Sequence, residues 1–117
     1  MGGVFESKDD GRTFDLMPGS PLADVAIAIS PIDQNILYVS SFSVSTNTYG
    51  LFKSTNGGIT WNLVNHQVFN SLSVDPYNNS IVIGEEYSSD YYGNPEISFN
   101  GGNTFTSLNF ETVNCPP

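Results

Sequence analysis

The chain has 117 residues and a mass of 12.7 kDa, the size of one ordinary domain. Its 3 Lys and Arg residues against 12 Asp and Glu give a net charge of −9, which excludes binding to nucleic acids or to acidic membranes, because both depend on clustered cations. No window approaches the ~18 apolar residues of a membrane span, and the first residues lack the basic and apolar regions of a secretory signal peptide.

The first predicted element is a hairpin over residues 3–16, in which an Asp-rich turn joins two short strands. Further strand-like runs follow, each short, rich in β-branched or aromatic residues and bounded by turn residues. They cover residues 25–29, 36–42, 50–53, 61–64, 69–74, 80–85, 96–99 and 104–109. No segment has the apolar spacing of an amphipathic helix, so the pattern predicts an all-β fold.

One eight-residue pattern occurs three times along the chain. Each copy reads Ser, any residue, Asp or Asn, any residue, Gly, any residue, Thr and an aromatic residue. Gly accepts a positive φ and the Asp or Asn side chain bonds nearby backbone amides, so each copy predicts a tight structural turn. The repeated residues are Ser7, Asp9, Gly11, Thr13 and Phe14, then Ser54, Asn56, Gly58, Thr60 and Trp61, then Ser98, Asn100, Gly102, Thr104 and Phe105.

Two features of these copies lead to further expectations. Asn56 and Asn100 stand where the first copy has Asp9, and Asn keeps the acceptor oxygen, so the turn should survive in all three. The aromatic residues Phe14, Trp61 and Phe105 share one repeat position, and we expect them to pack between neighbouring units rather than to bind a ligand.

The spacing of the copies predicts the architecture. Four strands in each unit of about 40–50 residues is the period of a β-propeller blade. The chain then divides into a half blade at 3–16, full blades at 23–65 and 67–109, and a tail at 110–117. We expect an all-β partial propeller of about two and a half blades, each full blade having four antiparallel strands.

The octapeptides resemble the Asp-box, or bacterial neuraminidase repeat, of sialidases, sortilin-type receptors, xyloglucan hydrolases and photosystem assembly factors. The segments SPIDQNILYVSS at 30–41 and GLFKSTNGGITW at 50–61 are most similar to the xyloglucan hydrolase and sortilin-like branch. The resemblance covers residues 3–109. It implies a propeller in which the Asp-boxes are structural hairpins on one rim, with ligands bound on the other.

Two and a half blades do not close a ring, since propellers have four to eight blades. Three arrangements are open: a fragment of a larger propeller, a homo-oligomer that completes one ring, or a stand-alone stack of sheets. The first two need either the remainder of a larger propeller or further copies as partners.

Aromatic and acidic residues gather on the rim opposite the Asp-boxes. Tyr rings offer flat apolar faces and carboxylates accept hydrogen bonds from sugar hydroxyls, a combination that suits carbohydrate. The other interpretation is that they are ordinary exposed loop residues. The predicted ligand-binding residues are Tyr49, Glu85, Glu86, Tyr87, Asp90, Tyr91 and Tyr92.

Catalytic candidates are few. Glu85 and Glu86 are adjacent in a strand and point to opposite faces, so they are a poor acid and base pair by themselves. Asp24 is the weak candidate, because the xyloglucan hydrolase resemblance implies that a carboxylate near the channel could face one from another blade. Sialidases bind their substrate with several Arg, whereas this chain has only Arg12, in an Asp-box.

Neither a cofactor nor a metal is expected, because His66 and Cys115 are single residues with no set of ligands around them. The predicted function is a non-catalytic module or fragment that binds carbohydrate or a protein partner. The alternatives are a fragment of a secreted glycoside hydrolase, xyloglucanase-like rather than sialidase, and an assembly factor or sorting receptor. The acidic, Asn-, Ser- and Thr-rich composition favours an extracellular protein.

Overall fold

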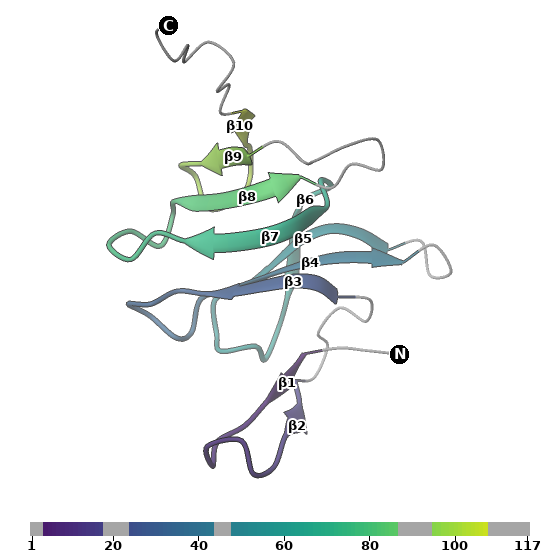
Figure 1. Cartoon of the computed structure of the whole chain (residues 1–117), viewed down its shortest axis with the longest axis vertical. Helices are drawn as coiled ribbons and strands as arrows, with labels where there is room; N and C mark the ends of the chain where they lie inside the picture. The colour runs from purple at the N-terminus through teal and green to yellow at the C-terminus, as the bar shows by residue number, and fades with distance from the viewer. Residues whose placement is uncertain (1–3, 18–23, 44–47, 87–94, 108–117) are drawn as a thin grey trace, which may run out of the picture.

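The computed structural model describes residues 4–17, 24–43, 48–86 and 95–107, and these residues form ten β-strands (Figure 1). None of them lies in a helix, so no helix long and apolar enough to cross a membrane occurs in this part of the chain. The predicted all-β class is confirmed.

The strands form three antiparallel sheets that follow one another along the chain. The N-terminal hairpin has two strands, and the second and third sheets have four each, in sequential order (Figure 1). Two four-stranded sheets and a half sheet are the two and a half blades predicted. The strands are β1 (Phe5–Glu6) and β2 (Asp15–Leu16); β3 (Asp24–Ile29), β4 (Leu37–Ser43), β5 (Thr48–Ser54) and β6 (Asn62–Asn65); β7 (Phe69–Val74), β8 (Val82–Glu86), β9 (Pro95–Ser98) and β10 (Thr106–Ser107).

The sheets stack face to face and bury two apolar clusters. The cluster between the second and third sheets contains Ala28, Tyr38, Leu51, Phe69, Val74 and Val82. The cluster between the N-terminal hairpin and the second sheet contains Val4, Met17, Leu37 and Val39, with Trp61 packed against it. Strand β4 contributes to both clusters, because alternate side chains of a strand point to opposite faces.

The three octapeptides form the same turn, here called the octapeptide turn. In each, the Ser hydroxyl accepts a hydrogen bond from the backbone N–H of the repeated Gly, at 2.7 Å for Gly11, 2.8 Å for Gly58 and 2.9 Å for Gly102. These glycines have φ of 87°, 91° and 89°, which explains why Gly occurs there. The Asp or Asn side chain accepts from the backbone N–H of the Thr in all three copies.

The exchange of Asp for Asn reverses one hydrogen bond of the turn. The Thr13 hydroxyl donates to Asp9 at 2.6 Å, whereas Asn56 donates its amide N–H to the Thr60 hydroxyl at 2.7 Å. Hydrogen bonds from the side chain and backbone of Thr13 and from Ser7 lower the pKa of Asp9 to about 2. The turn therefore keeps its shape with either residue, but only the copy with Asp9 carries a negative charge at this position.

Each full sheet rests its octapeptide turn on the preceding sheet. A Cβ at Gly58 would lie 2.5 Å from Met17 Sδ of the N-terminal hairpin, and a Cβ at Gly102 would lie 2.9 Å from Leu51 Cδ2 of the second sheet. Both positions are too close to the neighbouring sheet for a side chain. The N-terminal hairpin therefore packs on the second sheet as the second packs on the third.

The predicted packing of the repeated aromatic residues is wrong for one of the three. Trp61 packs against the cluster that contains Val4 and Met17, and the ring of Phe105 lies 4.6 Å from that of Phe69. Phe14 is 59% exposed. The physical reason is that Trp61 and Phe105 each have a preceding sheet to pack on, whereas no described strand precedes the N-terminal hairpin.

Candidate functional site

The antiparallel order gives the stacked sheets two rims. Strands β4 and β8 run to the same side of the molecule, where β5 and β9 begin (Figure 1). The octapeptide turns follow β1, β5 and β9 at the other ends of these strands. Residues at the ends of β4 and β8 therefore share the rim that lies opposite the octapeptide turns.

On this rim, two carboxyl groups and an amide form what we call the rim cluster. Glu86 ends β8, Glu96 lies in β9, and their side chains are hydrogen-bonded to each other. Gln67 Nε2, from the connection between β6 and β7, donates to Glu96 Oε1 at 2.9 Å. Glu96 is only 8% exposed, while Glu86 and Gln67 are half-buried.

Strand register explains how the two glutamates meet. Glu96 lies opposite Gly84, and Glu86 is two residues further along β8, so both side chains lie on one face as diagonal neighbours. Phe69 lies opposite Glu86 on β7, and a Cβ at Gly84 would lie 2.7 Å from its ring. The absence of a side chain at Gly84 lets the buried Phe69 ring form an apolar floor next to the carboxyl pair.

The surroundings of Glu96 favour its protonated form. Burial raises its pKa to about 7, and the hydrogen bond to Glu86 and the charge of Glu86 act in the same direction. The hydrogen bond from Gln67 acts in the opposite direction. The carboxyl of Glu96 therefore gains and loses its proton near neutral pH.

Gln67 is fixed by the chain around it. Its backbone N–H donates to Asn65 Oδ1 at 2.7 Å, and Asn65 Nδ2 donates to Gln67 Oε1 at 3.1 Å. Asn65 Nδ2 also donates to the backbone carbonyl of Asn103 at 3.2 Å, in the octapeptide turn of the third sheet. The floor is tied to the second sheet as well, because the Phe69 N–H donates to Ser40 Oγ at 2.7 Å.

This geometry favours binding over hydrolysis by these residues alone. Two-carboxylate glycosidases separate their carboxyl groups by about 5–9.5 Å, because the sugar or a water molecule must fit between them. Hydrogen-bonded carboxyl groups are closer than that. Carboxylate oxygens beside an amide can instead match the hydroxyl groups of a sugar, because the oxygens accept hydrogen bonds and the second N–H of the Gln67 amide can donate one.

The structure places the predicted ligand residues as follows. Tyr49 is half-buried in β5, opposite Phe42 of β4. Glu85 and Glu86 are half-buried at the end of β8 on opposite faces, and only Glu86 joins the rim cluster. Tyr87, Asp90, Tyr91 and Tyr92 lie outside the described residues.

The weak catalytic candidate, Asp24, is the first residue of β3. Its backbone lies opposite Ser41 of β4, next to a register shift in the sheet. Among the residues that the structure describes, no group of three or more His, Cys, Asp and Glu side chains is placed to hold a metal ion.

Sequence reasoning did not select Glu96 or Gln67, although a signal for Glu96 is present. Glu96 lies opposite Gly84 in the third sheet, where the second sheet has Phe52 opposite Val39. Both Phe52 and Glu96 stand two residues before the Ser of an octapeptide. An acid that replaces the aromatic residue of the other copy breaks the repeat, and such a break indicates a residue with a role other than packing. Gln67 carries no such signal.

Comparison with known proteins identifies solved structures with a similar fold. Neither a scan of protein-family models nor a search of curated proteins found a match. Among solved structures, an ancestral GH74 enzyme matches 92% of this chain at 23% identity and a TM-score of 0.72. The GH74 enzyme of Niastella koreensis matches 90% at 22% identity and a TM-score of 0.70.

GH74 enzymes are β-propeller glycoside hydrolases, and the likeness shows that the sheets of this chain are stacked as propeller blades. The chain spans 15% and 18% of the length of the two matched enzymes.

Proposed function

We propose that this chain is a segment of an Asp-box β-propeller that binds carbohydrate through the rim cluster of Glu86, Glu96 and Gln67. The observation that carries the proposal is the hydrogen-bonded carboxyl pair beside a Gln amide, on the rim opposite the octapeptide turns. The carboxyl pair offers acceptor oxygens, and the amide of Gln67 carries a second N–H beside the one that it donates to Glu96. The likeness to GH74 enzymes supports a carbohydrate ligand.

The test is calorimetric titration of the purified chain with soluble β-glucan and xyloglucan oligosaccharides. We expect saturable binding that Glu86→Gln weakens about tenfold, because the charge-assisted hydrogen bond to a sugar hydroxyl is lost. Glu85→Gln is the matched control, since it removes the same charge from the opposite face of the same strand. Binding that depends equally on both residues, or no binding, would count against the rim cluster.

The second candidate is a segment of a glycoside hydrolase whose catalytic carboxylates are divided between this chain and other blades. The likeness to GH74 enzymes favours it, and Asp24 is then the residue to test. The chain alone should release no reducing sugar from xyloglucan, because its described carboxyl pair is too close for hydrolysis. Sugar release by the larger propeller that contains this segment, abolished there by Asp24→Asn, would replace the binding proposal with this one.

A protein partner is the other ligand that the sequence left open. It would appear as absence of glycan binding together with retention of a partner protein in a pull-down.

A further inference from the structure

The chain contains two Asn-Gly pairs, and both lie inside octapeptide turns, at Asn56-Gly57 and Asn100-Gly101. Asn-Gly is the dipeptide most prone to deamidation, because Gly has no side chain to hinder attack of its backbone nitrogen on the Asn side chain. The turn itself requires Gly after the Asn, since Gly57 and Gly101 have φ of 74° and 73°. At two of its repeated turns the fold therefore depends on the dipeptide that is chemically least stable.

Deamidation of Asn56 joins two neighbouring groups of the chain. The backbone nitrogen of Gly57 gives up its proton and forms a bond to Cγ of Asn56, and the side-chain amide takes up a proton and leaves as ammonia. Water then opens the succinimide ring. Cleavage of the new bond at Cγ gives Asp, whereas cleavage at the backbone carbonyl carbon of residue 56 gives isoaspartate, in which the chain continues through Cγ.

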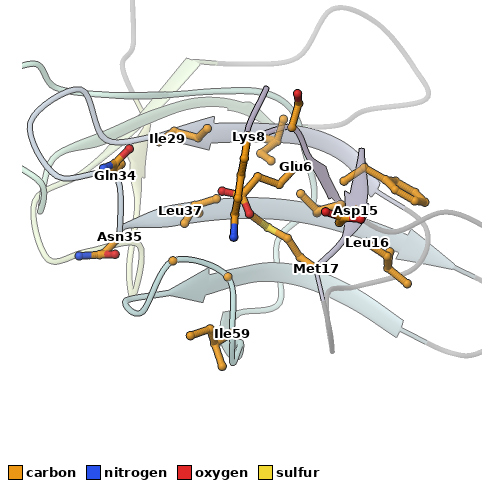
Figure 2. A pocket seen from close by; sticks show the side chains of 16 residues that line it. Glu6, Lys8, Asp15, Leu16, Met17, Ile29, Gln34, Asn35, Leu37 and Ile59 are labelled. Atoms are coloured by element: carbon orange, nitrogen blue, oxygen red, sulfur yellow. The ribbon is translucent and has the colours of Figure 1, made fainter. Parts of the chain in front are cut away.

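In the folded turn both reacting groups are held by other partners. The N–H of Gly57 donates to the backbone carbonyl of Asn35 at 3.0 Å, in the connection between β3 and β4. Asn35 and the octapeptide turn that carries Ile59 lie at the same end of the second sheet (Figure 2). The Asn56 side chain accepts from the Thr60 N–H at 3.0 Å and donates to Thr60 Oγ1 at 2.7 Å. The Gly57 proton is therefore shielded from the base that must remove it, and the amide is not free to rotate toward the nitrogen.

The third sheet repeats this arrangement. The N–H of Gly101 donates to the backbone carbonyl of Ser80 at 2.9 Å, and Ser80 has the repeat position of Asn35. The Asn100 side chain accepts from the Thr104 N–H at 3.1 Å and donates to Thr104 Oγ1 at 2.8 Å. Because two copies have the same bonds, protection is a property of the turn and not of one site.

The turn also distinguishes the two products. Asp fits, since Asp9 accepts the backbone N–H of Thr13 at 2.8 Å in the first copy. In isoaspartate the former side chain becomes part of the backbone, so its oxygen no longer reaches back to the N–H of the Thr, and the backbone is one methylene group longer. The third sheet has little room for this displacement, because a Cβ at Gly102 would lie 2.9 Å from Cδ2 of the fully buried Leu51.

We propose that Asn56 and Asn100 are deamidation sites that react only when the octapeptide turn opens, and that the folded turn accepts Asp but not isoaspartate at both positions. Modification at these sites then records exposure of each turn to the unfolded state, and isoaspartate formed there removes a chain from the folded population. This inference does not depend on carbohydrate binding.

The test compares the folded chain with the chain unfolded in guanidinium chloride, at the same mildly alkaline pH and temperature. Peptide mapping by mass spectrometry detects replacement of the amide NH₂ by OH and separates Asp from isoaspartate peptides. In the unfolded chain we expect Asn56 and Asn100 to react faster than any other Asn. In the folded chain both should react at least about a hundredfold more slowly, because reaction is confined to the open fraction of the turn.

Two reciprocal variants locate the protection in the turn. Thr60→Val removes the hydroxyl that holds the Asn56 amide and keeps the backbone N–H, and Thr104→Val does the same for Asn100. Each variant should accelerate deamidation of the folded chain about three- to tenfold at its own site and leave the other site unchanged. If a variant unfolds, which acceleration at both sites would reveal, the other variant and the comparison of the folded and unfolded parent decide.

Refolding of the deamidated chain tests the choice between the products. After size exclusion, the folded fraction should contain Asp but no isoaspartate at positions 56 and 100. Similar rates of deamidation in the folded and unfolded parent, or folded variants that react as the parent does, would overturn the protection. Isoaspartate in the folded fraction at the same share as in the whole sample would overturn the selection of products.

Discussion

The two complete sheets share one backbone plan but exchange an acid and an aromatic residue at the rim. In the second sheet the acid, Asp24, begins the first strand and the aromatic residue, Phe52, is on the third strand. In the third sheet the aromatic residue, Phe69, begins the first strand and the acid, Glu96, is on the third. Both first strands have a register shift directly after this position. The comparison teaches that the repeat sets the sheet, while the residues at its rim set the chemistry.

Among the residues that distinguish the two sheets, removal of the buried Phe69 ring should change the free energy of unfolding most. Phe69 is fully buried and contacts Phe105, so Phe69→Ala should lower the free energy of unfolding by about 3–5 kcal/mol. Urea denaturation measures the change. Phe99→Ala, at a largely exposed ring in the octapeptide turn that follows β9, should stay within about 0.5 kcal/mol of the parent. Similar losses in both variants would mean that Phe69 has no special role.

The acid of the third sheet should make stability depend on pH near neutrality. Because the pKa of Glu96 is raised from 4.5 to about 7, the folded state holds a proton that the unfolded state has already lost in this interval. Stability should therefore fall as pH rises from about 4.5 to about 7, by on the order of 1–3 kcal/mol, and then level off. Urea denaturation across this range measures the slope.

The neutral variant Glu96→Gln serves as the control for that measurement. It keeps the shape of the side chain but cannot ionise, so the slope between about pH 4.5 and 7 should largely disappear. A slope unchanged in the variant would assign the pH dependence to another group.

The smallest expected effect is on the acid dependence of stability, and it distinguishes the octapeptide turn that contains Asp9 from the two that contain Asn. The pKa of Asp9 is lowered from 3.8 to about 2, so its contribution to stability is present above about pH 4 and is lost as pH falls towards 2. Asp9→Asn should keep the turn, as Asn56 and Asn100 do, and remove this part of the acid dependence. Thermal melts between pH 2 and 5 are the measurement. A variant that is destabilised equally at every pH would show that the carboxylate shapes the turn.

Much of the fold was predictable from the sequence because its signals are local and repeated. Strand-forming runs between turn residues located every strand of both four-stranded sheets, and the octapeptides located the turns between their third and fourth strands. The exposure of Phe14 was not predictable, because burial of this position depends on the sheet before it rather than on its own sequence.

The rim cluster was only half predictable for a related reason. Glu86 stood out as an acid at the end of a strand, but its partner depends on the register between β8 and β9. Residues 87–94 connect these strands, and a shift of one residue would turn Glu96 to the other face. The desolvation that raises the pKa of Glu96 is a property of the packed sheet, so it has no counterpart in the sequence pattern.

The alternating side chains of β4 have a consequence for how the molecule comes apart. Leu37 and Val39 are buried against the N-terminal hairpin, while Tyr38 is buried in the cluster shared with the third sheet. A strand that serves two cores cannot leave one of them without disturbing the other. Its backbone should therefore be the last to open, and the two-stranded hairpin the first, so that β4 links the local opening of one sheet to the next.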